Sequence, residues 1–274
     1  KIRNLHWWTV EYGLIGTIDE HKIYGAGLLS SISESVTYTL HDANNLISYP
    51  FIASQSLGDA LPDAVEDEVF AIVGEGVASI NLGGAWAGSL NGFDGGSGYW
   101  FARVAGSEDV SFEYNAPSAG NARSVTKVLP EVPEAFRYTQ STEQAFYFVE
   151  SITQDGEAMT GDNWILAYNN GVVVGARMWN GEYTDIPAMG SEANNNSTAG
   201  YSEKGSYITF KVYDASEGVL VDMNLSEGES VWVNNSMTVV SMSDIVMPTE
   251  VSLSKAYPNP FNPSTTISYD VPSD

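Results

Sequence analysis

The sequence predicts a mostly β protein, in which an antiparallel β-meander module with one short helix is followed by a β-sandwich module. Short runs of β-branched and aromatic residues recur along most of the 274 residues, and turns rich in glycine and asparagine separate them. Hydrophobic residues make up 43% of the chain, enough to build packed cores. The expected segments are an N-terminal segment (1–36), the meander (37–114), a linker (115–133), the sandwich (134–247) and a C-terminal segment (248–274).

The chain is strongly acidic: 35 aspartates and glutamates stand against 11 lysines and arginines, for a formal net charge of -24. Such a field repels nucleic acid and anionic membranes, so neither is expected as a partner. Cysteine is absent, which excludes disulfides and zinc–thiolate sites. No apolar run approaches the roughly 20 residues that span a bilayer, so membrane insertion is not expected. The start of the chain shows no pattern of a secretory signal peptide.

The N-terminal segment contains two aromatic and apolar stretches, HWWTVEYGL at residues 6–14 and KIYGAGLLSS at residues 22–31. Glu11 lies among bulky apolar neighbours, where a buried carboxylate needs a cation or strong hydrogen bonds. Taken alone, it is interpreted as an exposed glutamate, because isolated acids are mostly exposed.

Together these two stretches resemble the pterin-dependent aromatic amino-acid hydroxylases. The resemblance implies that Glu11 is the carboxylate of an iron site with two histidines and one carboxylate, with Fe2+ and tetrahydropterin as cofactors. Such a site needs two neutral imidazoles. The three histidines of the chain, His6, His21 and His41, form no His-x-x-x-x-His pair. We therefore expect this segment to be a remnant without catalytic competence of its own.

The meander is expected to begin with strands at 36–40 and 46–52. A helix is predicted within 56–73, capped by Asp59 and with Pro62 near its start. Further strands are expected at 77–82, 85–90 and 99–104, separated by glycine-rich turns. The module resembles one common in secreted proteins of Bacteroidetes-like bacteria. If exposed, Trp86, Tyr99 and Trp100 would form a glycan-stacking platform; the alternative is that they belong to the core.

Residues 115–133 are rich in Pro, Ala, Ser and Asn, as in a linker. A second set of strands follows, and its strongest signal is a hairpin of residues 164–168 and 172–177 around Asn170-Gly171. Later strands are expected at 207–213, 219–223 and 230–240. Seven or eight strands of this kind favour a sandwich, similar to domains that precede type IX sorting signals.

Acidic loops in the second module suggest a calcium site, because Ca2+ takes six to eight oxygen ligands from such groups. The candidate ligands are Asp155, Glu157 and Asp162, with Asp185 and the loop 191–196 as further acidic positions. No EF-hand spacing is present, and ordinary turn chemistry explains the same residues.

No other catalytic signature is recognisable in the sequence. The glycine-rich stretch 92–98 lacks the lysine and helix of a phosphate loop, and no Gly-x-Ser-x-Gly elbow occurs. Three scattered histidines argue against a histidine-based hydrolase. Paired carboxylates for glycoside hydrolysis stay open, because spatial separation cannot be read from sequence.

The C-terminal segment holds a proline-rich motif that resembles the opening of a type A sorting domain of bacterial type IX secretion. The motif consists of Tyr257, Pro258, Asn259, Pro260, Phe261, Asn262 and Pro263. Its prolines exclude a helix, and a strand is expected at 265–271. The resemblance implies an extracellular or cell-surface location, with the type IX secretion machinery as a partner.

The sequence therefore favours a secreted or cell-surface protein that acts by binding or structure, with a glycan or another surface protein as its ligand. The main alternative is a fragment of an iron- and tetrahydropterin-dependent aromatic amino-acid monooxygenase. A carbohydrate-active enzyme is the weaker alternative.

Overall fold

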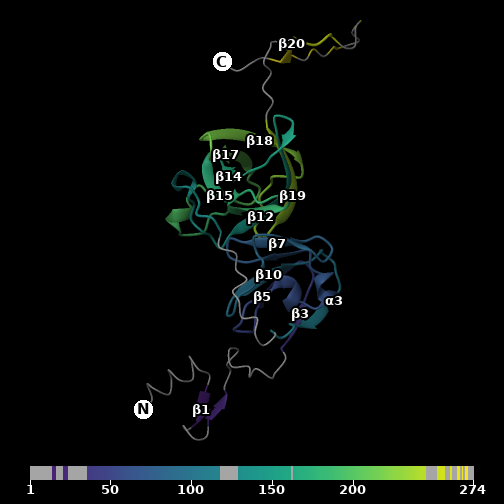
Figure 1. The fold of residues 1–274 in the computed structure, drawn as a ribbon, viewed down its shortest axis with the longest axis vertical. Coiled ribbons are helices and arrows are strands. Elements are labelled where there is room, and N and C mark those ends of the chain that lie inside the picture. Colours follow the sequence, from purple (N-terminus) through teal and green to yellow (C-terminus); the bar gives the residue numbers. More distant parts are fainter. Residues whose placement is uncertain are drawn as a thin grey trace. The chain divides into compact units, whose positions relative to one another are not determined.

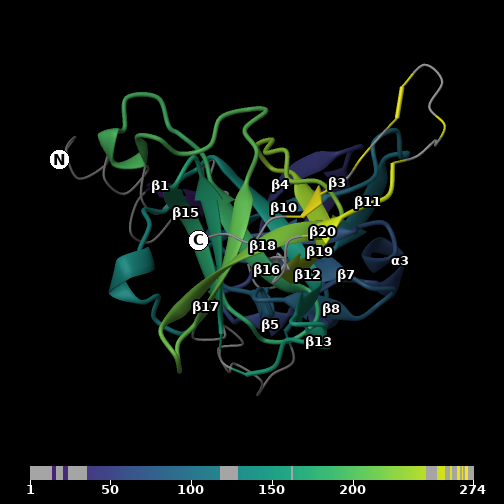
Figure 2. The same ribbon diagram turned by 90° about the horizontal axis from the view of Figure 1, so that it is seen from above.

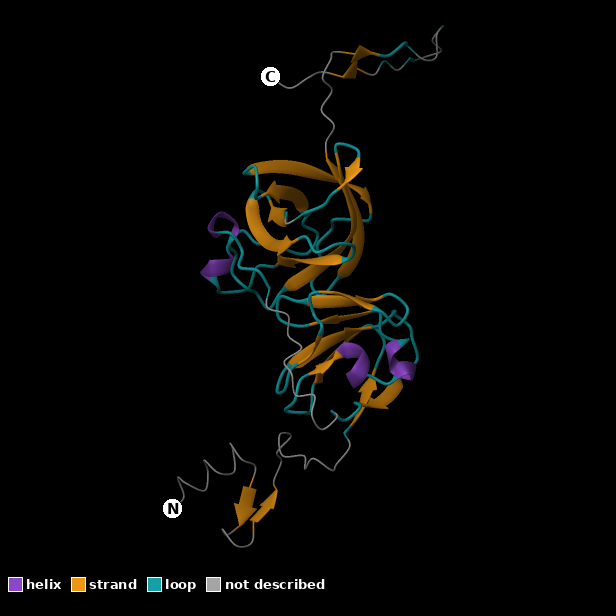
Figure 3. Cartoon of the chain, in the orientation of Figure 1, coloured by secondary structure: helices purple, strands orange, loops and turns teal. Residues whose placement is uncertain are grey.

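Strands dominate the computed structural model, as predicted, and helices contribute only single turns (Figure 3). The structure describes residues 14–16, 21–23, 36–117, 129–161, 163–244, 252–256, 260, 264–265, 267 and 269–270. The chain divides into two units, residues 1–131 (unit 1) and 132–274 (unit 2); Figure 1 colours the chain by residue number. No helix among the described residues has the length and apolar character needed to cross a membrane.

Unit 1 is a meander of short strands. A five-stranded antiparallel sheet has the order β4-β10-β6-β7-β8, and the pairs β11-β3, β5-β9 and β1-β2 complete the strands described in this unit. The strands are β1 (Leu14–Gly16), β2 (His21–Ile23), β3 (Thr37–Leu40), β4 (Asn44–Ser48), β5 (Gln55–Ser56), β6 (Ala71–Val73), β7 (Ala78–Asn81), β8 (Trp86–Gly88), β9 (Gly92–Phe93), β10 (Gly98–Ala102) and β11 (Val110–Glu113).

The single predicted helix is instead two one-turn helices, α2 (Leu57–Ala60) and α3 (Asp63–Glu66). Pro62 lies between them and forces Leu61 into an extended conformation, which ends the first helix. Ser56, not Asp59, is the N-cap of α2, and its Oγ accepts from the Asp59 amide at 3.2 Å. The apolar residues placed at the end of the predicted helix form β6, where pairing with β7 and β10 buries them.

One face of the sheet and the strand pairs β11-β3 and β5-β9 enclose an aromatic core. Phe93 stacks on Tyr49 and on Phe101, and the edge of Tyr114 meets all three of these rings. Aromatic contacts of this kind add to the stability that burial of the rings provides. Short strands thus close a core through large side chains rather than through sheet length.

A buried arginine joins the segments around this core. Arg103 follows β10, its side chain is 1% exposed, and it donates five hydrogen bonds. Nη1 donates to the carbonyls of Leu40 and His41, Nη2 to the Glu68 carboxylate and the Glu108 carbonyl, and Nε to the Glu68 carbonyl, at 2.8–3.3 Å. A guanidinium has five N–H donors, so all of them are satisfied.

Unit 2 contains one large curled sheet with the order β13-β12-β19-β18-β17-β14-β15, and β16 also pairs with β12 (Figure 2). β12 and β19 are parallel, whereas the other pairs are antiparallel. The elements are η1 (Glu134–Phe136), β12 (Gln144–Gln154), β13 (Glu157–Ala158), β14 (Trp164–Asn169), β15 (Val172–Met178), β16 (Thr184–Met189), η2 (Asn196–Thr198), β17 (Thr209–Asp214), β18 (Val219–Glu227) and β19 (Met237–Asp244).

The predicted sandwich core is thus enclosed by one continuous sheet, whose concave side buries Tyr147, Ile165, Phe210 and Trp232. The predicted hairpin is β14–β15, with Asn170 and Gly171 at positive φ in its turn. On the outer side, Phe136 packs against Tyr213 over the buried strand β14. The segment that includes η1 therefore covers the convex side of the sheet.

β15 and β16 approach closely without a hydrogen-bonded ladder between them. A Cβ on Gly175 would lie 1.6 Å from the Pro187 carbonyl oxygen, so only glycine fits there. Beside it, Arg177 Nη2 lies 3.1 Å from Asp185 Oδ2, and Arg177 Nε donates to the Asp185 carbonyl. Both side chains are buried, so this ion pair joins two strands that backbone pairing does not.

Toward the C-terminus, β20 (Ser252–Leu253) and β21 (Tyr269–Asp270) form a two-stranded antiparallel sheet. The strand predicted at 265–271 is thus paired at its end with a segment that precedes the proline-rich motif. Leu253 and Tyr269 face each other across the pair, and both are exposed.

Replacing Arg103 with methionine should destabilise unit 1 by about 3 kcal/mol, because one buried and three partly buried hydrogen bonds to backbone carbonyls are lost together with the bond to the Glu68 carboxylate. Urea denaturation followed by tryptophan fluorescence measures the change. The control is Lys204→Met, which alters an exposed cation and should have little effect. Equal stability of Arg103→Met and the unaltered chain would contradict the role of this arginine.

Gly175→Ala should cost about 2–3 kcal/mol of unfolding free energy, since the added methyl group forces β15 away from β16. Gly98→Ala is the matched control, because its Cβ would meet the Leu46 side chain at an ordinary 3.6 Å. Thermal denaturation of both variants provides the comparison. A Gly175 variant no less stable than the control would show that the strands can separate at little cost.

Candidate functional site

The three aromatic residues predicted to stack on a glycan do not form one platform. Tyr99 is 4% exposed and belongs to the core of unit 1. Its hydroxyl accepts from the Asp94 amide at 2.7 Å, and burial raises its pKa. The prediction that Tyr99 is an exposed stacking residue is therefore wrong, and the core alternative holds for it.

Trp86 and Trp100 are half-buried and lie on opposite faces of the sheet. Trp86 packs against the core, and its indole N–H donates to the buried carboxylate of Glu66. Trp100 follows Tyr99 directly in β10, so it points to the other face. There it pairs across the strands with Leu46, which is 61% exposed. The alternation of side chains along β10 separates the predicted platform.

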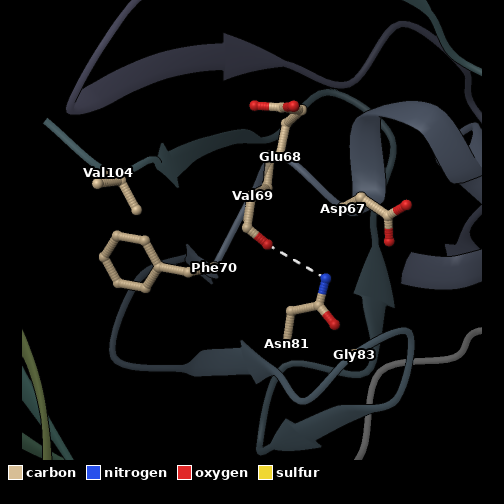
Figure 4. Close-up of a pocket in the computed structure, with 7 residues that line it drawn as sticks. All are labelled: Asp67, Glu68, Val69, Phe70, Asn81, Gly83 and Val104. Carbon is tan, nitrogen blue, oxygen red and sulfur yellow. Dashed lines mark hydrogen bonds between the residues drawn. The ribbon is translucent and has the colours of Figure 1, made fainter. Parts of the chain in front are cut away.

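Unit 1 has a pocket among its described residues. It has a volume of about 170 Å³ and lies where the segment between α3 and β6 meets the β7–β8 turn and the end of β10. We call it the α3–β6 pocket. Its lining residues are Asp67, Glu68, Val69, Phe70, Asn81, Gly83 and Val104 (Figure 4).

Hydrogen bonds hold the rim of this pocket from two sides. Asn81 Nδ2 donates to the carbonyls of Glu66 at 2.7 Å and Val69 at 3.2 Å, and its Oδ1 accepts from the Gly84 amide. Arg103 binds both the carbonyl and the carboxylate of Glu68. The segment 66–70 is thus anchored before any ligand arrives.

The surfaces left open in the pocket are acidic and apolar. The Asp67 carboxylate is exposed and makes no hydrogen bond or ion pair with any residue that the structure describes. Glu68 has one oxygen on Arg103, and its side chain is 48% exposed. Phe70 and Val104 lie next to each other on the side away from Asp67 (Figure 4).

Nothing in the sequence indicated this pocket. Residues 67–70 were expected inside a helix, where their side chains would point around the helix axis. The split at Pro62 and the strand β6 turn the same residues into a loop whose side chains meet the β7–β8 turn. A pair of adjacent acids before an aromatic residue was the only signal in the sequence, and such pairs are common on surfaces.

The calcium prediction stays untested. Asp155 and Glu157 lie at the exposed β12–β13 turn, where the Asp155 amide donates to Asp244 Oδ2, and Asp162 is outside the described residues. Within the part of the chain that the structure describes, no three histidine, aspartate or glutamate side chains gather as a metal site. Asp185 is occupied by Arg177.

The carboxylate of Glu192, in the acidic loop after β16, is held by hydrogen bonds from neighbouring residues. Glu192 accepts hydrogen bonds from the Thr142 amide at 2.5 Å, from Asn195 Nδ2 at 2.7 Å, and from the hydroxyls of Thr142 and Ser141. These donors, led by the Thr142 amide, lower the pKa of Glu192 to about 2. The ionised carboxylate therefore ties this loop to the start of β12.

The predicted iron ligand Glu11 lies outside the described residues, as do the side chains of His6 and His21. His41 follows β3, and its Nδ1 lies 2.9 Å from Asp109 Oδ2, with both side chains exposed. The described residues therefore provide no iron site with two histidines and a carboxylate. Of the sorting motif, only Pro260 is described, and it is exposed; Tyr257, Pro258, Asn259, Phe261, Asn262 and Pro263 lie outside the described residues.

Comparison with known proteins links the N-terminal region to one family. The model of the biopterin-dependent aromatic amino acid hydroxylases matches residues 1–60. Phenylalanine-4-hydroxylase of Chromobacterium violaceum is 54% identical over 43 residues, which are 16% of this chain and 14% of that protein. The Ralstonia nicotianae protein of the same name is also 54% identical over 43 residues, 16% of this chain and 13% of its own.

Phenylalanine-4-hydroxylase of Caenorhabditis elegans is 41% identical over 49 residues, 18% of this chain and 10% of that protein. The chain thus covers about a seventh or less of each of these relatives. No solved structure matches the chain. The hydroxylase-like segment predicted from the sequence is confirmed, and the family match extends beyond residue 36 into β3, β4, β5 and α2.

Glu192→Gln should lower stability at neutral pH and lose this effect in acid. The folded-state pKa is depressed from 4.5 to about 2, so the carboxylate contributes stability above about pH 4.5 that is lost as the pH falls toward 2. Urea midpoints of both chains between pH 7 and pH 3 should therefore converge. Glu203→Gln, at an exposed position in the same unit, should match the unaltered chain at pH 7. If the urea midpoint of Glu192→Gln differed from that of the unaltered chain by the same amount at every pH, the ionised carboxylate would be excluded as the cause.

Proposed function

We propose that this chain is a secreted or cell-surface protein that acts by binding or as a structural part, exported by type IX secretion. The observation that carries the proposal is a contrast: the charged groups named next bind other parts of the same unit, whereas one anchored pocket is left open to a ligand. Arg103, Arg177 and Glu192 are engaged in bonds that hold loops and strands together. The α3–β6 pocket, in contrast, offers a pre-anchored concave surface, as expected of a binding module.

The export route rests on the proline-rich motif alone, and the ligand class is open to a glycan or another surface protein. For a glycan, the candidate contact is Trp100 with its exposed cross-strand neighbour Leu46, since an aromatic ring beside an apolar side chain suits the apolar face of a sugar. Trp86 is less suited because Glu66 and the core hold its indole.

A second candidate function is that of an aromatic amino-acid monooxygenase fragment, which the family match at residues 1–60 favours. Under this candidate Glu11 would bind iron, and tetrahydropterin would be the second cofactor. The donor set does not fit such a site, because the three histidines of the chain form no His-x-x-x-x-His pair and His41 lies beside Asp109 in unit 1. We therefore place this function second, and a carbohydrate-active enzyme third.

Export and ligand class are tested together. The chain, fused behind a signal peptide, should reach the surface of cells with a working type IX system and accumulate in the periplasm of cells without one. For any glycan that binds on an array, Trp100→Ala should weaken binding by at least about tenfold. Trp86→Ala should mainly lower the stability of the fold.

Retention in both strains would contradict the export route. Stoichiometric iron together with pterin-dependent tyrosine formation from phenylalanine would establish the second candidate instead. Depolymerisation of a polysaccharide by the purified chain would establish the third.

A further inference from the structure

The strand β4 is the outer strand of the five-stranded sheet in unit 1, and no other described strand pairs with its far side. The Tyr49 amide donates to the Ser97 carbonyl at 3.0 Å, in the same register as the ladder between β4 and β10. Hydrogen-bonded residues alternate along an antiparallel ladder, so Leu46 and Ser48 direct their N–H and C=O groups away from β10. Both residues are exposed, Leu46 at 61%.

Among the described residues, β4 lacks the features that usually protect a sheet edge, which are charged side chains, a bulge or a covering strand. Residues 43–58 carry no charged side chain, although the net charge of the chain is -24. Pro50, two residues after Ser48, has no N–H and therefore limits the length of any further ladder. The open edge is thus short, uncharged and defined at one end.

We propose that β4 pairs with β4 of a second copy of this chain, in an antiparallel ladder about a twofold axis at Ile47. Leu46 of each copy then lies opposite Ser48 of the other, and each of these pairs exchanges both of its N–H···O=C bonds. This register uses the outward groups of both residues and ends at Pro50, which has no N–H to add.

Charge favours this surface for contact between two copies. Two chains of net charge -24 repel each other wherever their acidic surfaces meet. The five strands of this sheet contain no Asp, Glu, Lys or Arg, so pairing through β4 brings no like charges of the strands together. A cationic partner would find no carboxylate on β4, whereas the edge complements itself without any second protein.

The pairing would join two five-stranded sheets into one continuous sheet. Trp100 lies beside Leu46 in the neighbouring strand, so the twofold axis places Trp100 of both copies on the same face. The inference goes beyond the proposed function, because it requires neither export nor a glycan.

Sedimentation equilibrium of the full chain tests the inference, over protein concentrations up to the millimolar range. Salt screens the repulsion between the copies, so the dimer dissociation constant should fall at least about tenfold between about 0.05 M and about 1 M NaCl. Hydrogen exchange reports the contact directly. The amides of Leu46 and Ser48 should exchange at least about tenfold more slowly where the dimer is populated than in dilute protein.

Leu46→Glu should raise the dimer dissociation constant at least about tenfold in 1 M NaCl, because it places like charges along the shared edge. Val104→Glu is the matched control: it adds the same charge at a side chain that is 67% exposed but lies outside β4. Ser48→Glu is a second edge variant and should act as Leu46→Glu does. Urea midpoints of the variants show that each is folded.

A chain that stays monomeric at millimolar concentration in 1 M NaCl overturns the inference. A dimer that Leu46→Glu weakens no more than Val104→Glu also overturns it, because the contact would then lie elsewhere. Slower exchange at Leu46 and Ser48 of a monomeric chain, seen only when a free peptide of residues 43–51 is added, would make the edge a site for a foreign strand instead. Failure of export or of the glycan array leaves these outcomes unchanged, so the two proposals fail independently.

Discussion

The need to satisfy a buried guanidinium organises unit 1. Arg103 reaches acceptors on the end of β3, on the segment between α3 and β6, and on the loop before β11. Each of these acceptors would be costly to bury alone, so the three segments are stable only where they converge on one side chain. The α3–β6 pocket exists because this convergence fixes Glu68 while Asn81 fixes the carbonyls on the other side.

In unit 2, a buried arginine with its acceptors likewise joins β15 to β16, two strands between which there is no hydrogen-bonded ladder. β16 pairs with β12, and its contact with β15 depends on Gly175 and on the buried pair of Arg177 with Asp185. A buried charge without its partner is strongly destabilising, so this pair favours one arrangement of the two strands over alternatives. The curled sheet thereby surrounds its core although it contains one parallel pair, β12 with β19.

The hydroxylase-like sequence and the β-meander overlap along the chain. The family match ends at residue 60, and residues 37–60 form β3, β4, β5 and α2 of unit 1. Tyr49 and Leu57 within this overlap contribute to the core of unit 1. In this chain, the end of the matched sequence therefore serves the packing of a β-module, and a functional account has to treat the N-terminal segment and the β units separately.

The sequence by itself determined the mostly β class, the hairpin around Asn170-Gly171 and the hydroxylase-like segment, because each depends on local propensity or on a contiguous motif. It did not determine the break at Pro62, the single curled sheet or the pocket. It also left open which aromatic rings are exposed, although alternation along β10 already excludes Tyr99 and Trp100 from a shared face. Those features were decided by the tertiary structure, since the acceptors of Arg103 and the neighbours of Asp67 come from segments distant in sequence, and only folding brings them together.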